Sequence, residues 1–117
     1  MEQVTEQDLI DAGLTAPRVT SAAIEGAISS EHYFTADNGV WGEAYPASES
    51  GIDIPAPLKL LTFCVLVLKN GFTVTGESAC ASPENFNAEI GRKIAREHAI
   101  EKIWPLLGYE LRTKLSA

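Results

Sequence analysis

The sequence predicts an α+β fold in which an antiparallel β-hairpin, or a small sheet built on it, packs against N-terminal helices and a long C-terminal helix kinked by a proline. Two patterns favour this class. An almost continuously apolar stretch over 58–68 leads through Asn70-Gly71 into a second extended run, which is typical of a hairpin. Apolar residues three and four apart then follow, as in an amphipathic helix. With 117 residues, 45% of them hydrophobic, the chain fits a single domain spanning 1–117.

Residues 1–35 are predicted to be the helical N-terminal part. Thr5 and the acids after it suit the start of a helix, and Gly13 provides its stop. A second helix is expected to begin at Thr15-Ala16-Pro17, because proline is favoured in the first turn, and to end near Ser29-Ser30. Tyr33-Phe34-Thr35 then indicates a brief strand.

A long loop is predicted over 36–57, where Gly, Pro, Ser, Asp and Asn dominate. Loops of more than about 12 to 15 residues are uncommon in compact domains and often bind ligands. Trp41 and Tyr45 therefore have two interpretations. They form a lid over a site, or they pin the loop to the core, as large aromatic side chains usually do.

The hairpin and the C-terminal helices are expected within 58–117. A two-residue turn at Asn70-Gly71 would pair position 69 with 72 and would place the following residues on one face: Leu61, Phe63, Val65, Val67, Val74, Gly76, Ser78 and Cys80. Cys64 would then point to the opposite face. We therefore expect no disulfide between Cys64 and Cys80, unless a bulge shifts the pairing.

A long helix is predicted from Pro83 to about Trp104, because Ser82-Pro83-Glu84 combines a hydroxyl cap, a first-turn proline and an acid. Its buried stripe is predicted to be Phe86, Ile90, Gly91, Ile94, Ala95, Ala99 and Ile103. Pro105 is expected to break or kink this helix, before a short last segment over 106–115.

Charge divides the chain into two unequal halves. Residues 1–58 hold ten acids and one base, residues 59–117 hold six acids and eight bases, and the whole chain carries −7. A general nucleic-acid binder is disfavoured because it neutralises phosphates with cations, but the second half can still take an anionic ligand. The sequence has no apolar stretch long enough for a membrane span and no leader-like N-terminus, so we expect a cytoplasmic protein.

No catalytic constellation is recognisable, although Cys80 and His98 could form a thiolate pair. The cysteines and histidines lack metal-ligand spacing, and we expect no metal, cofactor or enzymatic activity. A cluster of bases on the long helix is more informative, since Arg92 and Arg96 lie four residues apart and project side by side. Two guanidiniums near a helix start suit a diphosphate, and the alternative is a solvated face balanced by neighbouring glutamates.

Five short sequence words between about Thr62 and Leu111 resemble, in order and spacing, a family of small tailed-phage proteins. They are Leu68-Lys69-Asn70-Gly71-Phe72, Gly76-Glu77-Ser78-Ala79-Cys80, Ser82-Pro83-Glu84-Asn85-Phe86, Gly91-Arg92-Lys93-Ile94-Ala95 and Lys102-Ile103-Trp104-Pro105-Leu106-Leu107-Gly108-Tyr109. The resemblance implies a relation to the Thoeris anti-defence one protein, a sponge that binds a cyclic ADP-ribose isomer without cleaving it, so that the host's immune effector is not triggered. It also implies a place in the host cytoplasm, dimers or larger oligomers, and capture of cyclic oligonucleotides by some members.

Six residues are the candidate ligand contacts for such a role. The rings of Phe72 and Phe86 would stack on a base, Asn85 would bond a base or ribose edge, and Arg92, Arg96 and Arg112 would hold phosphate. Two other functions stay open. The acidic half could imitate nucleic acid and occupy a basic groove of a host protein, or the chain could be a small structural phage component.

Overall fold

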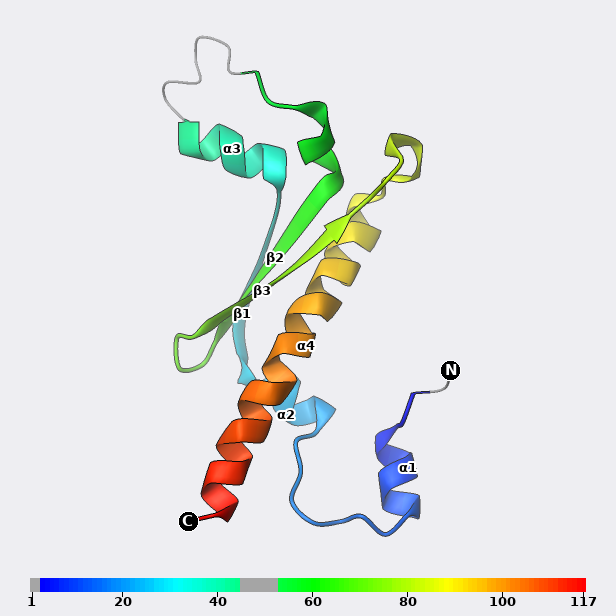
Figure 1. The fold of residues 1–117 in the computed structure, drawn as a ribbon, viewed down its shortest axis with the longest axis vertical. Coiled ribbons are helices and arrows are strands. Elements are labelled where there is room, and N and C mark those ends of the chain that lie inside the picture. Colours follow the sequence, from blue (N-terminus) through cyan, green and yellow to red (C-terminus); the bar gives the residue numbers. More distant parts are fainter. Residues whose placement is uncertain (1–2, 45–52) are drawn as a thin grey trace.

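The computed structural model describes residues 3–44 and 53–117 and confirms the α+β class. Three strands form an antiparallel sheet in the order β1-β2-β3: β1 (Ile28–Thr35), β2 (Leu61–Leu68) and β3 (Thr73–Ala79). The 28-residue helix α4 (Ala88–Leu115) runs along one face of this sheet and continues past its end (Figure 1).

Two short helices precede the sheet, and each begins at a threonine cap. Thr5 and the Asp8 side chain form a capping box at α1 (Glu6–Asp11). Thr20 caps α2 (Ser21–Ala27) by accepting a hydrogen bond from the Ala23 amide. α2 thus begins later than the sequence predicted, because Thr20 and not Thr15 supplies the cap. The predicted brief strand is the end of the eight-residue β1, which is longer because its backbone pairs with β2.

The core lies between the sheet and α4, whose buried residues are Gly91, Ala95, Ala99 and Ile103. The helix approaches β3 closely because Gly76 has no side chain: a Cβ atom there would lie 2.1 Å from the Ala95 carbonyl oxygen. The predicted stripe is therefore right for Gly91, Ala95, Ala99 and Ile103. It is wrong for Ile90 and Ile94, which are 55% and 36% exposed. Beside Gly76 the helix lies too close to β3 for a large side chain, whereas Ile103 is buried further along α4.

The hairpin register differs from the prediction. Leu68 pairs with Phe72 around a three-residue loop, Lys69-Asn70-Gly71, in which Gly71 has a φ of 89°. The additional loop residue shifts the pairing between β2 and β3 by one residue. The β2 side chains that were predicted to share a face with Val74 and Gly76 therefore lie on the other face. Accordingly, α4 covers Thr62, Cys64, Leu66 and Leu68, and the opposite face carries the half-buried Leu61, Phe63, Val65 and Val67.

The two cysteines are free, although not for the predicted reason. Cys64 lies on the face that α4 covers, where it pairs with Gly76. Cys80 lies beyond the end of β3, where its amide bonds the Leu60 carbonyl oxygen. The two thiols are therefore separated by their distance along the strands. They are not separated, as predicted, by lying on opposite faces of the hairpin.

The long loop predicted over 36–57 is in part helical. α3 (Ala36–Ala44) follows β1 directly, and a 3-10 turn, η2 (Ala56–Leu60), leads into β2. Trp41 belongs to α3 and is 46% exposed, so the core does not enclose it. Tyr45 lies outside the described residues.

The beginning of α4 also differs from the prediction. Ser82-Pro83-Glu84 starts only a 3-10 turn, η3 (Pro83–Asn85), and α4 begins after Asn87, whose Oδ1 accepts a hydrogen bond from the Ile90 amide. The helix then continues through Pro105 to Leu115 without a break. The part of α4 before Pro105 packs against the sheet, which stabilises the helix there. Pro105 itself removes only one backbone hydrogen-bond donor.

Candidate functional site

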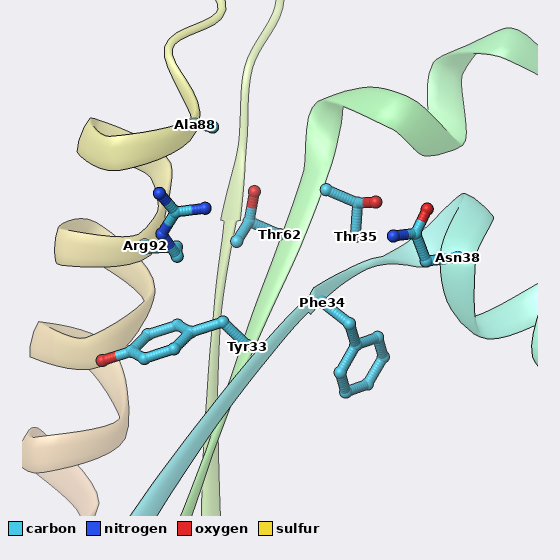
Figure 2. A pocket seen from close by; sticks show the side chains of 7 residues that line it. All are labelled: Tyr33, Phe34, Thr35, Asn38, Thr62, Ala88 and Arg92. Carbon is cyan, nitrogen blue, oxygen red and sulfur yellow. The ribbon is translucent and has the colours of Figure 1, made fainter.

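A recess lies beside the end of β1, where α4 begins. α4 packs mostly on β3 and β2, which leaves space next to β1 on the same face of the sheet. The recess has a volume of about 150 Å³ and is lined by Tyr33, Phe34, Thr35, Asn38, Thr62, Ala88 and Arg92 (Figure 2). We call these seven residues the α4-start pocket. Four elements meet there: β1, α3, β2 and α4.

Arg92 supplies the positive charge of the α4-start pocket. Its guanidinium extends from the second turn of α4 toward Thr62 (Figure 2). Within residues 3–44 and 53–117, no carboxylate forms an ion pair with it. Ala88, the first residue of α4, lines the same recess, and the positive end of the helix dipole therefore adds to the charge of Arg92.

Thr62 contributes a hydroxyl group whose hydrogen-bonding capacity is unused. The residue is 3% exposed, and its Oγ1 is buried without a partner among the described residues. Gly91 lies against it, since a Cβ atom at Gly91 would be 3.0 Å from this oxygen. A buried hydroxyl without a partner is unfavourable, so a polar occupant of the pocket would find a group that favours its binding.

The remaining side chains form the rim of the pocket. The Asn38 amide faces it from α3, and the Thr35 hydroxyl donates a hydrogen bond to the Asp37 carboxylate (Figure 2). Phe34 turns its ring away and stacks on Phe63 on the opposite face of the sheet, with ring centroids 5.4 Å apart. The pocket therefore combines polar groups with apolar surface, and Tyr33 is the aromatic ring on its side of the sheet.

Arg96, one turn after Arg92, is occupied by two acids. Its Nη1 and Nη2 donate to the Glu25 carboxylate at 3.1 and 2.7 Å, and its Nε donates to Glu31 at 3.1 Å. Tyr33 also donates its hydroxyl proton to Glu31, at 3.0 Å. Arg96 therefore connects α2, β1 and α4, and we call this set the Arg96 clamp: Arg96, Glu25, Glu31 and Tyr33.

The Arg96 clamp changes the acidity of its members. The hydrogen bond from Arg96 lowers the pKa of Glu25, and the same bond raises the pKa of Arg96. Burial raises the pKa of Tyr33, and its bond to Glu31 adds to the effect. The Tyr33 hydroxyl is consequently a stable donor at neutral pH.

The comparisons with known proteins identify the family of the chain. Residues 19–115, more than four fifths of the sequence, match the phage protein (N4 Gp49/phage Sf6 gene 66) family. The chain belongs to this family. Searches of curated proteins and of solved structures gave no match. The resemblance to phage proteins is thereby confirmed at the level of the family.

The fold of this phage protein separates the six predicted ligand contacts. Arg92 lies in the α4-start pocket, and Asn85 and Phe86 line a second pocket of about 230 Å³ on the other side of the first turns of α4. Phe72 directly follows the hairpin loop, roughly 20 Å from Thr62 at about 3.3 Å per strand residue. Arg112 is in the last turn of α4, and Arg96 belongs to its clamp. The six residues do not form one site.

With Arg92 as the exception, six of the seven pocket residues were not predicted as ligand contacts: Tyr33, Phe34, Thr35, Asn38, Thr62 and Ala88. The sequence offered no signal for them, because they come from separate elements and belong to no motif. Within the described part of the phage protein, no group of three or more His, Cys, Asp and Glu side chains is arranged for a metal ion. In the same part, no helix combines the length and the apolar character that crossing a bilayer requires.

Proposed function

We propose that this phage protein binds and sequesters a cyclic nucleotide, of the cyclic ADP-ribose type, in the cytoplasm of the infected host, and that it acts against the host's immune signalling. The observation that carries the proposal is Arg92, a guanidinium that faces a recess and has no carboxylate partner among the described residues. Such a cation at the start of a long helix suits a phosphate group.

The pocket groups match the parts of a nucleotide that carry charge and hydroxyl groups. Arg92 can bond two phosphate oxygens at once, and the start of α4 favours the same negative charge. The Thr62 hydroxyl and the Asn38 amide can donate to phosphate or bond a ribose hydroxyl. Burying a phosphate is unfavourable unless donors replace its water, and the α4-start pocket supplies them from three elements.

The size of the pocket limits how much of the ligand enters it. Sites for whole drug-sized molecules measure about 300–1,000 Å³. The α4-start pocket measures about 150 Å³, so it suits a phosphate with part of its sugar, and the base would lie outside it.

The lining favours retention over cleavage. None of the seven residues of the α4-start pocket carries a carboxylate, an imidazole or a thiol. Tyr33 has a raised pKa and remains protonated, so it suits donation of a hydrogen bond better than nucleophilic attack. A protein that removes a messenger by mass action needs affinity and sufficient copies, and no chemical step.

Calorimetry with a cyclic ADP-ribose isomer tests the proposal. We expect the full-length protein to bind, and we expect Arg92→Ala to lose at least tenfold in affinity, as for the loss of a charged hydrogen bond worth about 1.5–3 kcal/mol. Lys93→Ala is the matched control, since Lys93 is the next residue, its side chain is 72% exposed and, among the described residues, it pairs only with Glu89, at 3.6 Å. Heat denaturation of the loaded protein should release the ligand intact.

The results that would reject the proposal are specific. Absence of heat with a panel of cyclic ADP-ribose isomers and cyclic oligonucleotides would exclude a sponge, and a hydrolysed product would indicate an enzyme. Salt-sensitive binding of a basic host protein without ligand binding would favour the acidic interaction module. That alternative is weakened by the fold, because Arg18 and Arg96 already pair with the acids Glu6, Glu25 and Glu31.

A further inference from the structure

Trp41 is a large aromatic side chain that the fold leaves partly in solvent. It lies on α3, a helix without a buried residue, and it is 46% exposed. An indole ring gains strongly from burial, because burial removes a large apolar area from water. The buried core of the described residues nevertheless draws no side chain from α3. The ring is therefore free to contact a ligand.

α3 begins at the α4-start pocket and places Trp41 beside it. Asn38 lines the pocket, and Trp41 follows three residues later, so the two side chains are neighbours on one face of the helix. Gly39 is about 200° around the helix from Trp41. It lies against Phe34, since a Cβ atom at Gly39 would be 3.3 Å from the Phe34 ring. Trp41 therefore points away from Phe34, on the side of Asn38.

The surface next to these two side chains is open. Gly42, four residues after Asn38, is the other neighbour on the same face of α3. Among the described residues, a Cβ atom at Gly42 would meet nothing within 4 Å. In Figure 1, α3 runs from the end of β1 away from the start of α4. A planar group outside the pocket can therefore approach the indole without meeting a side chain at position 42.

The charges distinguish the two ends of the pocket. Figure 2 shows Arg92 and Asn38 on opposite sides, with Thr62 between them. Arg92 and the start of α4 form the positive end. α3 instead carries two acids and no base, and Asp37 in its first turn offsets the positive end of this helix; the second acid is Glu43. A phosphate is therefore favoured at α4, and a neutral ring is favoured at α3.

The other aromatic rings near the pocket are less suited to a base. Phe34 stacks on another phenylalanine on the opposite face of the sheet. Phe86 lines the second pocket, on the other side of the first turns of α4. The ring of Tyr33 belongs to the wall of a recess of about 150 Å³, which is too small for a whole nucleotide. Among the described residues, Trp41 is the ring that borders the recess on the outside.

We propose that Trp41 is the stacking surface for the base of the nucleotide whose phosphate binds at Arg92, an inference that rests on the proposed function. The phosphate lies at the start of α4, the ribose passes Asn38, and the base lies outside the recess against the indole. Every nucleobase has a π-face that stacks on an aromatic side chain. Trp41 therefore selects nucleotides over bare phosphates and sugar phosphates.

Tryptophan fluorescence tests this position of the base, because the sequence contains only two tryptophans. The second, Trp104, lies on α4, about 18 Å from Arg92 along the helix axis at 1.5 Å per residue. In full-length protein carrying Trp104→Phe, a cyclic ADP-ribose isomer is expected to quench the emission of Trp41. In protein carrying Trp41→Phe, it should leave the emission of Trp104 unchanged. Quenching of Trp104 alone, or equal quenching of Trp41 by inorganic pyrophosphate, would overturn the inference.

Calorimetry with the same cyclic ADP-ribose isomer separates this inference from the proposed function. Trp41→Ala should weaken binding about fivefold or more, as for the loss of a stacked base, and Trp41→Phe should recover part of the affinity. Val40→Ala is the matched control, since Val40 is the adjacent residue and is 40% exposed. It lies about 200° around the helix from Asn38, so its loss should not affect binding.

The outcomes of the calorimetry differ for the two proposals. Binding that is lost in Arg92→Ala but unchanged in Trp41→Ala would overturn the position of the base and leave the proposed function intact. An equal loss in Val40→Ala and Trp41→Ala would also overturn it, by showing that any change on α3 disturbs the site. Absence of binding by the unmodified protein would overturn both proposals.

Discussion

Replacing Thr62 by valine should make the free protein more stable. The substitution exchanges a hydroxyl group for a methyl group at a position that is 3% exposed, where Oγ1 has no partner among the described residues. Proteins lose about 1–3 kcal/mol when such a hydroxyl is buried without a hydrogen bond. We therefore expect Thr62→Val to raise the free energy of unfolding by about 1–3 kcal/mol, and to weaken ligand binding if the hydroxyl contacts the ligand.

Urea denaturation followed by circular dichroism measures this change. Thr75→Val is the matched control, because Thr75 is exposed on β3 and the same exchange there should alter stability by no more than about 0.5 kcal/mol. An unchanged or lower midpoint for Thr62→Val would show that the hydroxyl is satisfied in solution. It would also remove this group from the argument for a polar ligand.

Three further predictions concern the packing, the Arg96 clamp and the buried thiol. Gly76→Ala should destabilise the protein by about 1–3 kcal/mol and lower its Tm, because the new Cβ would lie 2.1 Å from the Ala95 carbonyl oxygen; an unchanged melting curve would contradict the close packing. Arg96→Ala should lose more stability at pH 7 than at pH 3. Folding lowers the pKa of Glu25 from its ordinary 4.5, so the contribution of this pair is present above that pH and is lost as the pH falls through the folded-state pKa; equal losses at both pH values would refute it. Cys64 is 0% exposed and its thiol pKa is raised by burial, so iodoacetamide should label it only on unfolding, and mass spectrometry after a brief exposure of the native protein would detect any exception.

The sequence predicted the elements with strong local signals and failed where a local signal had two meanings. Asn70-Gly71 correctly indicated a hairpin, but the left-handed glycine serves a two-residue turn and a three-residue loop equally well. The register therefore depended on information outside the loop. α3 was missed because Gly39 and Gly42 each cost about 1 kcal/mol in a helix, and tertiary contacts override that preference.

The candidate site was predictable only in part, for a topological reason. Arg92 was found because a base on a regular helix is visible in the sequence. Asn38 and Thr62 lie beside Arg92 because α3, β2 and α4 meet there, and no local sequence pattern encodes that arrangement. Arg96 was assigned to phosphate because its partners Glu25 and Glu31 lie 71 and 65 residues away in the chain.

That separation affects how the chain can fold during synthesis. Glu25, Glu31 and the whole of β1 leave the ribosome long before Arg96, and β1 has no neighbouring strand until β2 follows it. The Arg96 clamp cannot close until Arg96 is outside the exit tunnel, so Glu25 and Glu31 gain their cationic partner later than β1 gains its neighbouring strand. A nascent chain stalled in the hairpin should therefore remain sensitive to proteases over its entire first half.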